Sequence, residues 1–305
     1  MQPRPGALSR NAFALPFAAL VLGAVAMGAS PIFVRLADVG PFTSAFWRMA
    51  LAVPVLWLWL QIEKSRTPVR ALDPARDWKL IAGIGFLFAG DLFFWHLAIM
   101  KTTVANATLL ATMTPLAVAF GAWMFLKEKV TKGILAGVAS GVLGALLLVG
   151  ASRTFNPENV YGDISGLITA GFFGAYFLAV AFARRRMSPA QVMFYPALVS
   201  TGFLFAAAVL LEDRLLPQSL EGVAALCALA LISQVGGQGF TAYALGHLPA
   251  VFSSLVMFIE VLAAASMAWV ILSEPVTIWQ LGGGLLILAG IYAARPKQEK
   301  AHFTP

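Results

Sequence analysis

The chain has 305 residues, of which 60% are hydrophobic and only 11% are charged, and its mean hydropathy is +0.82. Soluble globular domains carry roughly a quarter charged residues, so this composition excludes a soluble protein and predicts an integral membrane protein. The net charge of +7 does not indicate a nucleic-acid partner, because the basic residues are spread thinly and gather in short segments between apolar runs.

Ten apolar runs follow one another along the chain, and each has about the length of a transmembrane helix. None alternates with period two, so membrane-spanning strands are excluded. The first run mimics a signal peptide, with Arg4 and Arg10 before it, but its apolar residues continue to Val34 and favour a true span. The runs cover residues 14–34, 42–62, 79–99, 103–126, 132–151, 163–183, 190–211, 221–245, 249–272 and 277–294.

The basic residues alternate between the two sides of these runs. Sixteen lie before the first run, after the last, or in every second loop between them, and only four lie in the other loops. Basic residues are enriched in cytoplasmic loops. This asymmetry predicts that both termini are cytoplasmic, and it supports an even number of helices.

The second half of the chain repeats the first at a constant offset of 146 residues. The pattern W-x-x-L-x-E-x-V-T occurs at residues 123–131 and again at 269–277, and Gly137 and Gly144 align with Gly283 and Gly290. We therefore predict two five-helix repeats, at residues 14–151 and 163–294. Five is an odd number, so the repeats have opposite orientations. Inverted repeats are typical of alternating-access carriers, which hold their substrate near the bilayer midplane.

The chain resembles the EamA-type carriers of the drug/metabolite transporter superfamily. The resemblance rests on AMGASPIFVRLA and GPFTSAFWR near the start, on the L-x-E-x-V-T step after the fourth and ninth runs, and on the glycine-rich last helix of each half. It implies a ten-helix exporter of the bacterial inner membrane, with amino-acid exporters of the YddG type among its relatives. It also implies that helices 1, 3, 4, 6, 8 and 9 face a central cavity, while helices 5 and 10 are peripheral. Many such carriers have Pro after a Glu in the ninth helix. Here Val261 follows Glu260, which places the kink implied for helix 9 in doubt, whereas Pro115 retains a hinge at the matching position of helix 4.

Four ionisable side chains lie within the runs, where charges are costly. At 1.5 Å per helical residue, Asp91 and Arg48 differ in depth by about 5 Å. We predict an ion pair between them, and substrate or proton binding by Asp91 is the functional alternative. His96 lies closer to the outer edge, as a wall of the pathway or a hydrogen-bonded core residue. Glu260 lies near the midplane with no basic residue at matching depth, so it is either protonated or faces a wet cavity.

Neutral polar and aromatic residues complete the predicted pocket. In helix 8 the i, i+4, i+7 spacing of Gln234, Gln238 and Thr241 indicates one hydrogen-bonding face. The same pattern also occurs where small residues and amides only pack helices together. The remaining predicted wall residues are Phe94, Trp95, Asn106, Thr108, Tyr176 and Ser254.

These patterns predict a secondary transporter that exports small amphipathic metabolites, with amino acids as the favoured class. Export of another metabolite or drug, import and a channel are the alternatives. An intramembrane enzyme is disfavoured because no GxGD, HExxH or GxSxG motif is present, and Cys227 is the only cysteine. We expect no cofactor or metal, a monomer, and membrane lipid and a small solute as partners. Proton coupling and facilitated diffusion are both open.

Overall fold

The computed structural model describes residues 10–101, 110–111, 113–149, 160–272 and 278–296. All regular structure in these ranges is helical, which confirms the predicted all-α fold. The elements are α1 Arg10–Gly28, α2 Ser30–Leu36, α3 Pro41–Arg66, α4 Pro74–Lys101, α6 Thr114–Gly121, η1 Ala122–Leu126, α7 Lys132–Val149, α8 Val160–Ala183, α9 Pro189–Leu211, α10 Leu220–Ala228, η3 Leu229–Gln238, α11 Gly239–Leu245, α12 Ala250–Val256, α13 Ile259–Leu272 and α14 Ile278–Ala293.

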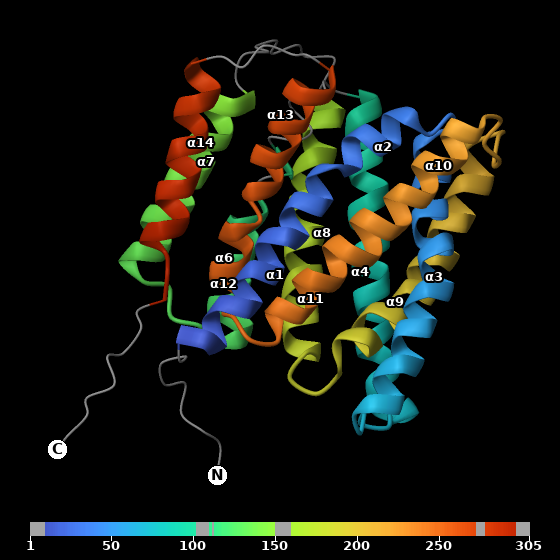
Figure 1. Cartoon of the computed structure of the whole chain (residues 1–305), viewed down its shortest axis with the longest axis horizontal. Helices are drawn as coiled ribbons and strands as arrows, with labels where there is room; N and C mark the ends of the chain where they lie inside the picture. The colour runs from blue at the N-terminus through green and yellow to red at the C-terminus, as the bar shows by residue number, and fades with distance from the viewer. Residues whose placement is uncertain (1–9, 102–109, 112, 150–159, 273–277, 297–305) are drawn as a thin grey trace.

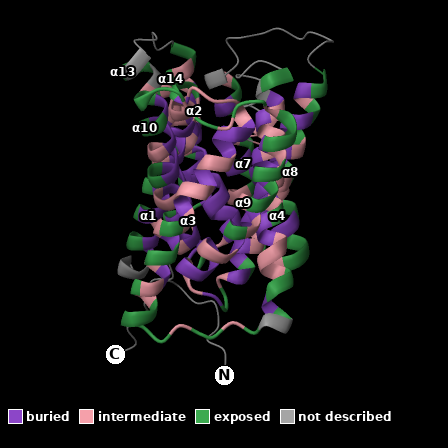
Figure 2. Cartoon of the chain, turned by 90° about the vertical axis from the view of Figure 1, so that its right-hand side faces the viewer, coloured by how far each residue is buried: buried purple, intermediate pink, exposed green. Residues whose placement is uncertain are grey.

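These elements follow the ten predicted spans in order, and several extend beyond the predicted bounds, as α3 and α4 do at both ends. Among the described residues, seven helical segments are long and apolar enough to cross a membrane, and three shorter apolar helices accompany them. Helix α1 begins and α14 ends at the same end of the bundle (Figure 1), as an even number of crossings requires. The helices lie side by side as one bundle, and their buried faces meet along its interior (Figure 2).

The outside of the bundle is strongly apolar. Leu210 of α9 and Leu220 of α10 are 80% and 84% exposed, and Phe125 of η1 is 70% exposed. Exposed side chains of this size would be unfavourable in water, but they suit contact with lipid tails. The bundle therefore buries polar groups inside and presents apolar side chains to the bilayer.

Glutamates from one half of the chain cap helices of the other half. Glu212, just after α9, accepts hydrogen bonds from the backbone N–H groups of Phe42 and Thr43 at the start of α3, at 2.7 and 3.0 Å. At the opposite end of this antiparallel pair, Glu63 of α3 accepts from Ser188 Oγ at 2.6 Å and from the N–H of Ala190 at 3.2 Å. A carboxylate at a helix N-terminus pairs free N–H groups and complements the helix dipole.

A third glutamate repeats this arrangement between helices 4 and 9. Glu128 follows η1 and accepts from the N–H groups of Ala250 and Val251 at the start of α12, at 3.0 and 3.3 Å. Its counterpart in the sequence repeat, Glu274, lies outside the described residues. The three carboxylates therefore join the two halves at their helix ends.

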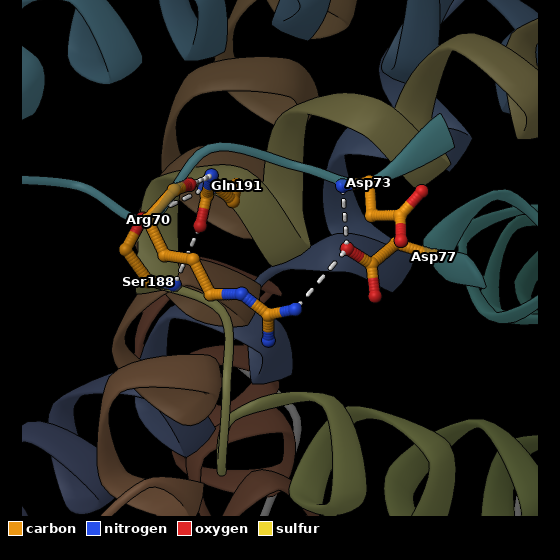
Figure 3. A network of polar contacts seen from close by, with 5 residues as sticks. All are labelled: Arg70, Asp73, Asp77, Ser188 and Gln191. Carbon is orange, nitrogen blue, oxygen red and sulfur yellow. Dashed lines mark hydrogen bonds and ion pairs between the residues drawn. The ribbon is translucent and has the colours of Figure 1, made fainter. Parts of the chain in front are cut away.

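The segment between α3 and α4 is also anchored to the start of α9 (Figure 3). Gln191 caps α9 by accepting from the N–H of Ser188, and its amide donates to the carbonyl of Arg70 at 2.8 Å. Arg70 lies 3.9 Å from the buried carboxylate of Asp77, which also accepts from the N–H of Asp73. These contacts fix the exit of α3 against the second half.

Helices α7 and α14 pack closely at one edge of the bundle (Figure 1). A Cβ added to Gly137 would meet the carbonyl of Gly290 at 2.8 Å, and one added to Gly144 would meet that of Gly283 at 2.5 Å. The sequence repeat aligns Gly137 with Gly283 and Gly144 with Gly290, so each glycine faces the counterpart of the other. This crosswise pairing is what an antiparallel, inverted repeat requires.

The helices around the centre of the bundle are interrupted. Ala29 separates α1 from α2, Met113 precedes α6, and Met257 and Phe258 separate α12 from α13. Pro115 lies in the first turn of α6, and its role as a hinge stays a prediction. Helix 9 breaks just before Glu260, although no proline follows that residue, so the interruption that the missing proline placed in doubt is present.

We predict that Gly144→Ala destabilises the protein by about 1 to 3 kcal/mol, because the added methyl group overpacks the contact with α14. Gly282→Ala is the matched control, since its Cβ would meet no atom within 4 Å, and alanine favours a helix over glycine. Thermal unfolding in detergent should show a lower midpoint for Gly144→Ala only. Equal midpoints for the two variants would contradict close packing at Gly144.

We further predict that Glu212→Gln lowers the free energy of unfolding by about 1 kcal/mol, because the start of α3 loses a charged cap. Asp213→Asn is the control, since it removes an exposed carboxylate from the adjacent position. The thermal midpoints of the two variants should differ. A Glu212→Gln midpoint equal to that of Asp213→Asn would show that the cap contributes no stability.

Candidate functional site

A cavity of about 140 Å³ lies in the middle of the bundle, between the two halves of the chain. Its described walls come from α1, the start of α2, α4, α6, α8, η3, α12 and α13, together with Arg48 of α3. These are helices 1, 3, 4, 6, 8 and 9 of the predicted spans, with one side chain from helix 2. No described residue of α7 or α14 lines it. The cavity therefore lies among the helices that the sequence resemblance implied.

Three charged side chains face this cavity. Arg48 is 5% exposed, and its Nε donates to Gln234 Oε1 at 2.9 Å. Its guanidinium lies 5.8 Å from the ring centroid of Phe88. Asp91 of α4 and Glu260 of α13 line the same cavity, and both are close enough to interact electrostatically with Arg48. One cation therefore serves two carboxylates.

The predicted direct ion pair is not formed in this structure. Among the described residues, no contact within 4.0 Å joins Arg48 to Asp91, because the guanidinium is held by Gln234 and is shared between two acids. The expectation that Glu260 has no basic residue near it is also corrected. Arg48 approaches it from α3, although the two residues are far apart in sequence.

Neutral polar groups and one aromatic ring from the prediction also line the cavity. Gln238 accepts from the hydroxyl of Tyr176 at 3.3 Å, while its Nε2 is buried with no hydrogen-bond partner among the described residues. Ser254 of α12 donates to the carbonyl of Val251 at 2.8 Å. Trp95 contributes the ring surface. An unpaired amide N–H group beside a cavity is available to an acceptor on a ligand.

Several other predicted residues support the cavity without lining it. Phe94 stacks on Phe172 of α8, with ring centroids 5.4 Å apart. His96 is 2% exposed, and its ring bonds the carbonyl of Leu92, so it does not form a wall of this cavity. Thr241 donates to the carbonyl of Gly237 at 2.9 Å. Asn106 and Thr108 lie outside the described residues.

Much of the aromatic wall was not predicted from the sequence. Phe88, Phe173 and Phe177 line the cavity, and the ring of Phe88 lies tilted against that of the predicted Tyr176, with centroids 4.7 Å apart. In an apolar helix, a phenylalanine facing a cavity looks the same in sequence as one facing lipid. Thr169 could have been found, because it is a polar residue within the apolar sixth run.

No metal site is evident in the described part of the chain, where no group of three or more His, Cys, Asp or Glu side chains comes together. The charged groups of the cavity are one guanidinium and two carboxylates from three different helices. This set offers a cation to the carboxylate of a dipolar organic solute and carboxylates to its ammonium group.

Comparisons with known proteins also indicate a membrane transporter. The chain is 27% identical over 258 residues to the "Pseudopaline exporter CntI" of Pseudomonas aeruginosa, covering 83% of this chain and 86% of that protein. It is 25% identical to an "Uncharacterized transporter" of Archaeoglobus fulgidus, covering 92% and 97% of the two chains. A solved structure, described only as "Crystal structure of protein", superposes with a TM-score of 0.77 at 19% identity, covering 94% and 97% of the chains, and shares the fold.

The family comparison covers both halves of the chain. The profile of the EamA-like transporter family matches residues 15–150 and again residues 160–295. The protein is thus a multi-pass membrane transporter that belongs to the EamA-like transporter family, with two EamA units in one chain.

Proposed function

We propose that this protein exports small amphipathic metabolites, with amino acids and their analogues as the favoured class, by alternating access through the central cavity. The observation that carries the proposal is the set of Arg48, Asp91 and Glu260 around one cavity between the two halves. We further propose that the protein is a monomer of the inner membrane, with both termini cytoplasmic and repeats at residues 14–151 and 163–294.

The cavity chemistry supports an amino-acid substrate. The terminal nitrogens of Arg48 can bind a substrate carboxylate, because Gln234 occupies only its Nε among the described residues. Asp91 and Glu260 can accept hydrogen bonds from an ammonium group. Trp95, Phe88 and Phe173 provide apolar surface for a hydrophobic or aromatic side chain. A phosphate ester would instead call for several cations, and the described wall has only one.

Alternating access is supported by the distribution of breaks and caps. Interrupted helices surround the cavity, whereas glutamate caps join the two halves at their ends. In carriers built from inverted repeats, substrate sites form where broken helices meet between the repeats. Export is favoured over import because one relative is named as an exporter. Coupling to protons would require a cavity carboxylate that can take up a proton, and both Asp91 and Glu260 are placed for this role.

The function is tested by transport into vesicles that contain the purified protein. We expect saturable uptake of at least one amino acid from a panel of neutral, aromatic, acidic and basic members, with counterflow of labelled substrate. An imposed pH gradient should change the rate if a carboxylate carries protons. No uptake of any panel member would refute an amino-acid substrate, and unsaturable flux without counterflow would favour a channel.

We predict that Arg48→Lys raises the KM for transported amino acids about tenfold, because an ammonium group cannot bind Gln234 and a substrate carboxylate in the geometry of a guanidinium. Uptake kinetics measure this effect, and an unchanged KM in Arg48→Lys would exclude Arg48 from substrate binding.

We also expect Arg48→Met to destabilise the protein by about 3 to 5 kcal/mol, since it leaves two buried carboxylates without their cation. Thermal unfolding in detergent measures this effect.

A further inference from the structure

The charges around the cavity do not balance. Arg48 contributes one positive charge, and Asp91 and Glu260 contribute two negative charges when both are ionised. The other ionisable groups near it are Tyr176, which donates to Gln238, and His96, which bonds the carbonyl of Leu92. No lysine and no second arginine appears in the described wall. With both acids ionised, the empty cavity therefore carries one excess negative charge.

An excess charge inside a membrane protein is costly and calls for a counter-charge. A proton on one carboxylate would supply it in the empty carrier. A neutral amino acid would not change the balance, because its own charges cancel. A solute with one carboxylate and two ammonium groups would bring the total to zero and would give every charge an opposite partner.

The positions of the three groups fit such a solute. They come from three helices, α3, α4 and α13, and all three line the cavity, so a solute bound there can meet each of them. Neither the Asp91 carboxylate nor the Glu260 carboxylate makes a hydrogen bond to another described side chain or backbone group, so both can accept from a ligand. Aromatic rings of Phe88, Phe173 and Trp95 lie in the same wall, and such rings also favour cations and aliphatic chains.

We propose that the cavity selects α-amino acids that carry a second ammonium group, with Arg48 binding the carboxylate and Asp91 and Glu260 each binding one ammonium. This inference rests on the proposed transport of amino acids and narrows it to a charge class. Lysine and norleucine are suitable probes, because they share a straight side chain of similar length and differ in the terminal ammonium group.

The test compares uptake of labelled lysine and norleucine by the full-length protein in vesicles at neutral pH. We expect wild-type protein to prefer lysine by about tenfold or more in kcat/KM, because a site built for a polar group rejects the analogue that lacks it. In Glu260→Gln this preference should fall to about twofold or less, mainly through loss of lysine transport. Retained norleucine uptake shows that the variant is folded.

Two further variants keep the result interpretable. Asp91→Asn removes the other carboxylate and should also weaken the lysine preference, so a failure of either variant to fold does not end the test. Glu221→Gln, which changes an exposed acid in the first turn of α10, is the control and should keep the wild-type preference for lysine.

A wild-type protein that prefers norleucine, or acid variants that retain the full lysine preference, would overturn the inference. Uptake of norleucine or phenylalanine without lysine would overturn it and leave amino-acid transport standing, whereas no uptake of any would overturn both.

Discussion

The buried guanidinium of Arg48 is the constraint around which the centre of this transporter is organised. An arginine side chain does not lose its proton in a protein, so a bundle that encloses one must supply acceptors and anions. Here Gln234 provides the acceptor, Asp91 and Glu260 provide the charge, and Phe88 provides a ring face. These partners come from both halves of the chain. One charge therefore interacts with residues of both repeats at the cavity between them.

The helix contacts around Arg48 are nearly symmetric between the two repeats, but the charged residues of the cavity are not. Ser140 of α7 donates to the carbonyl of Leu286, its own counterpart at the offset of 146 residues, so the pseudo-twofold axis passes close to this contact. Glu63 and Glu212 cap each other's helices in the same reciprocal way. By the same offset, Glu260 corresponds to Thr114, and both line the cavity. The repeats thus share their packing and differ in the residues that give the cavity its chemistry.

The sequence predicted what depends on periodicity along a single helix or on matching between the halves: the spans and the inverted repeat. It aligned the glycines of the two halves but did not predict that they pack against each other. It did not predict which neighbouring groups a side chain contacts, because this depends on how far each helix is rotated about its own axis. Arg48 and Asp91 have similar depths, yet depth alone does not decide which acceptor the guanidinium reaches. In helix 8, Gln234, Gln238 and Thr241 are all buried, but η3 has wider turns than an α-helix, so α-helical spacing does not decide which of the three face the cavity. Only Gln238 lines the cavity.

The backbone is interrupted where the cavity can accommodate it. Within a membrane, irregular backbone is tolerated only where it is covered by protein or faces a polar cavity. The breaks of helices 1, 4 and 9 satisfy this condition, because Ser30, Thr114 and Met257 beside them all line the cavity. Glu260 lies two residues after the break of helix 9, and Thr114, its counterpart in the first repeat, directly follows Met113. The interruptions and the polar residues of the cavity therefore coincide in both halves, because a polar cavity is what allows irregular backbone within a membrane.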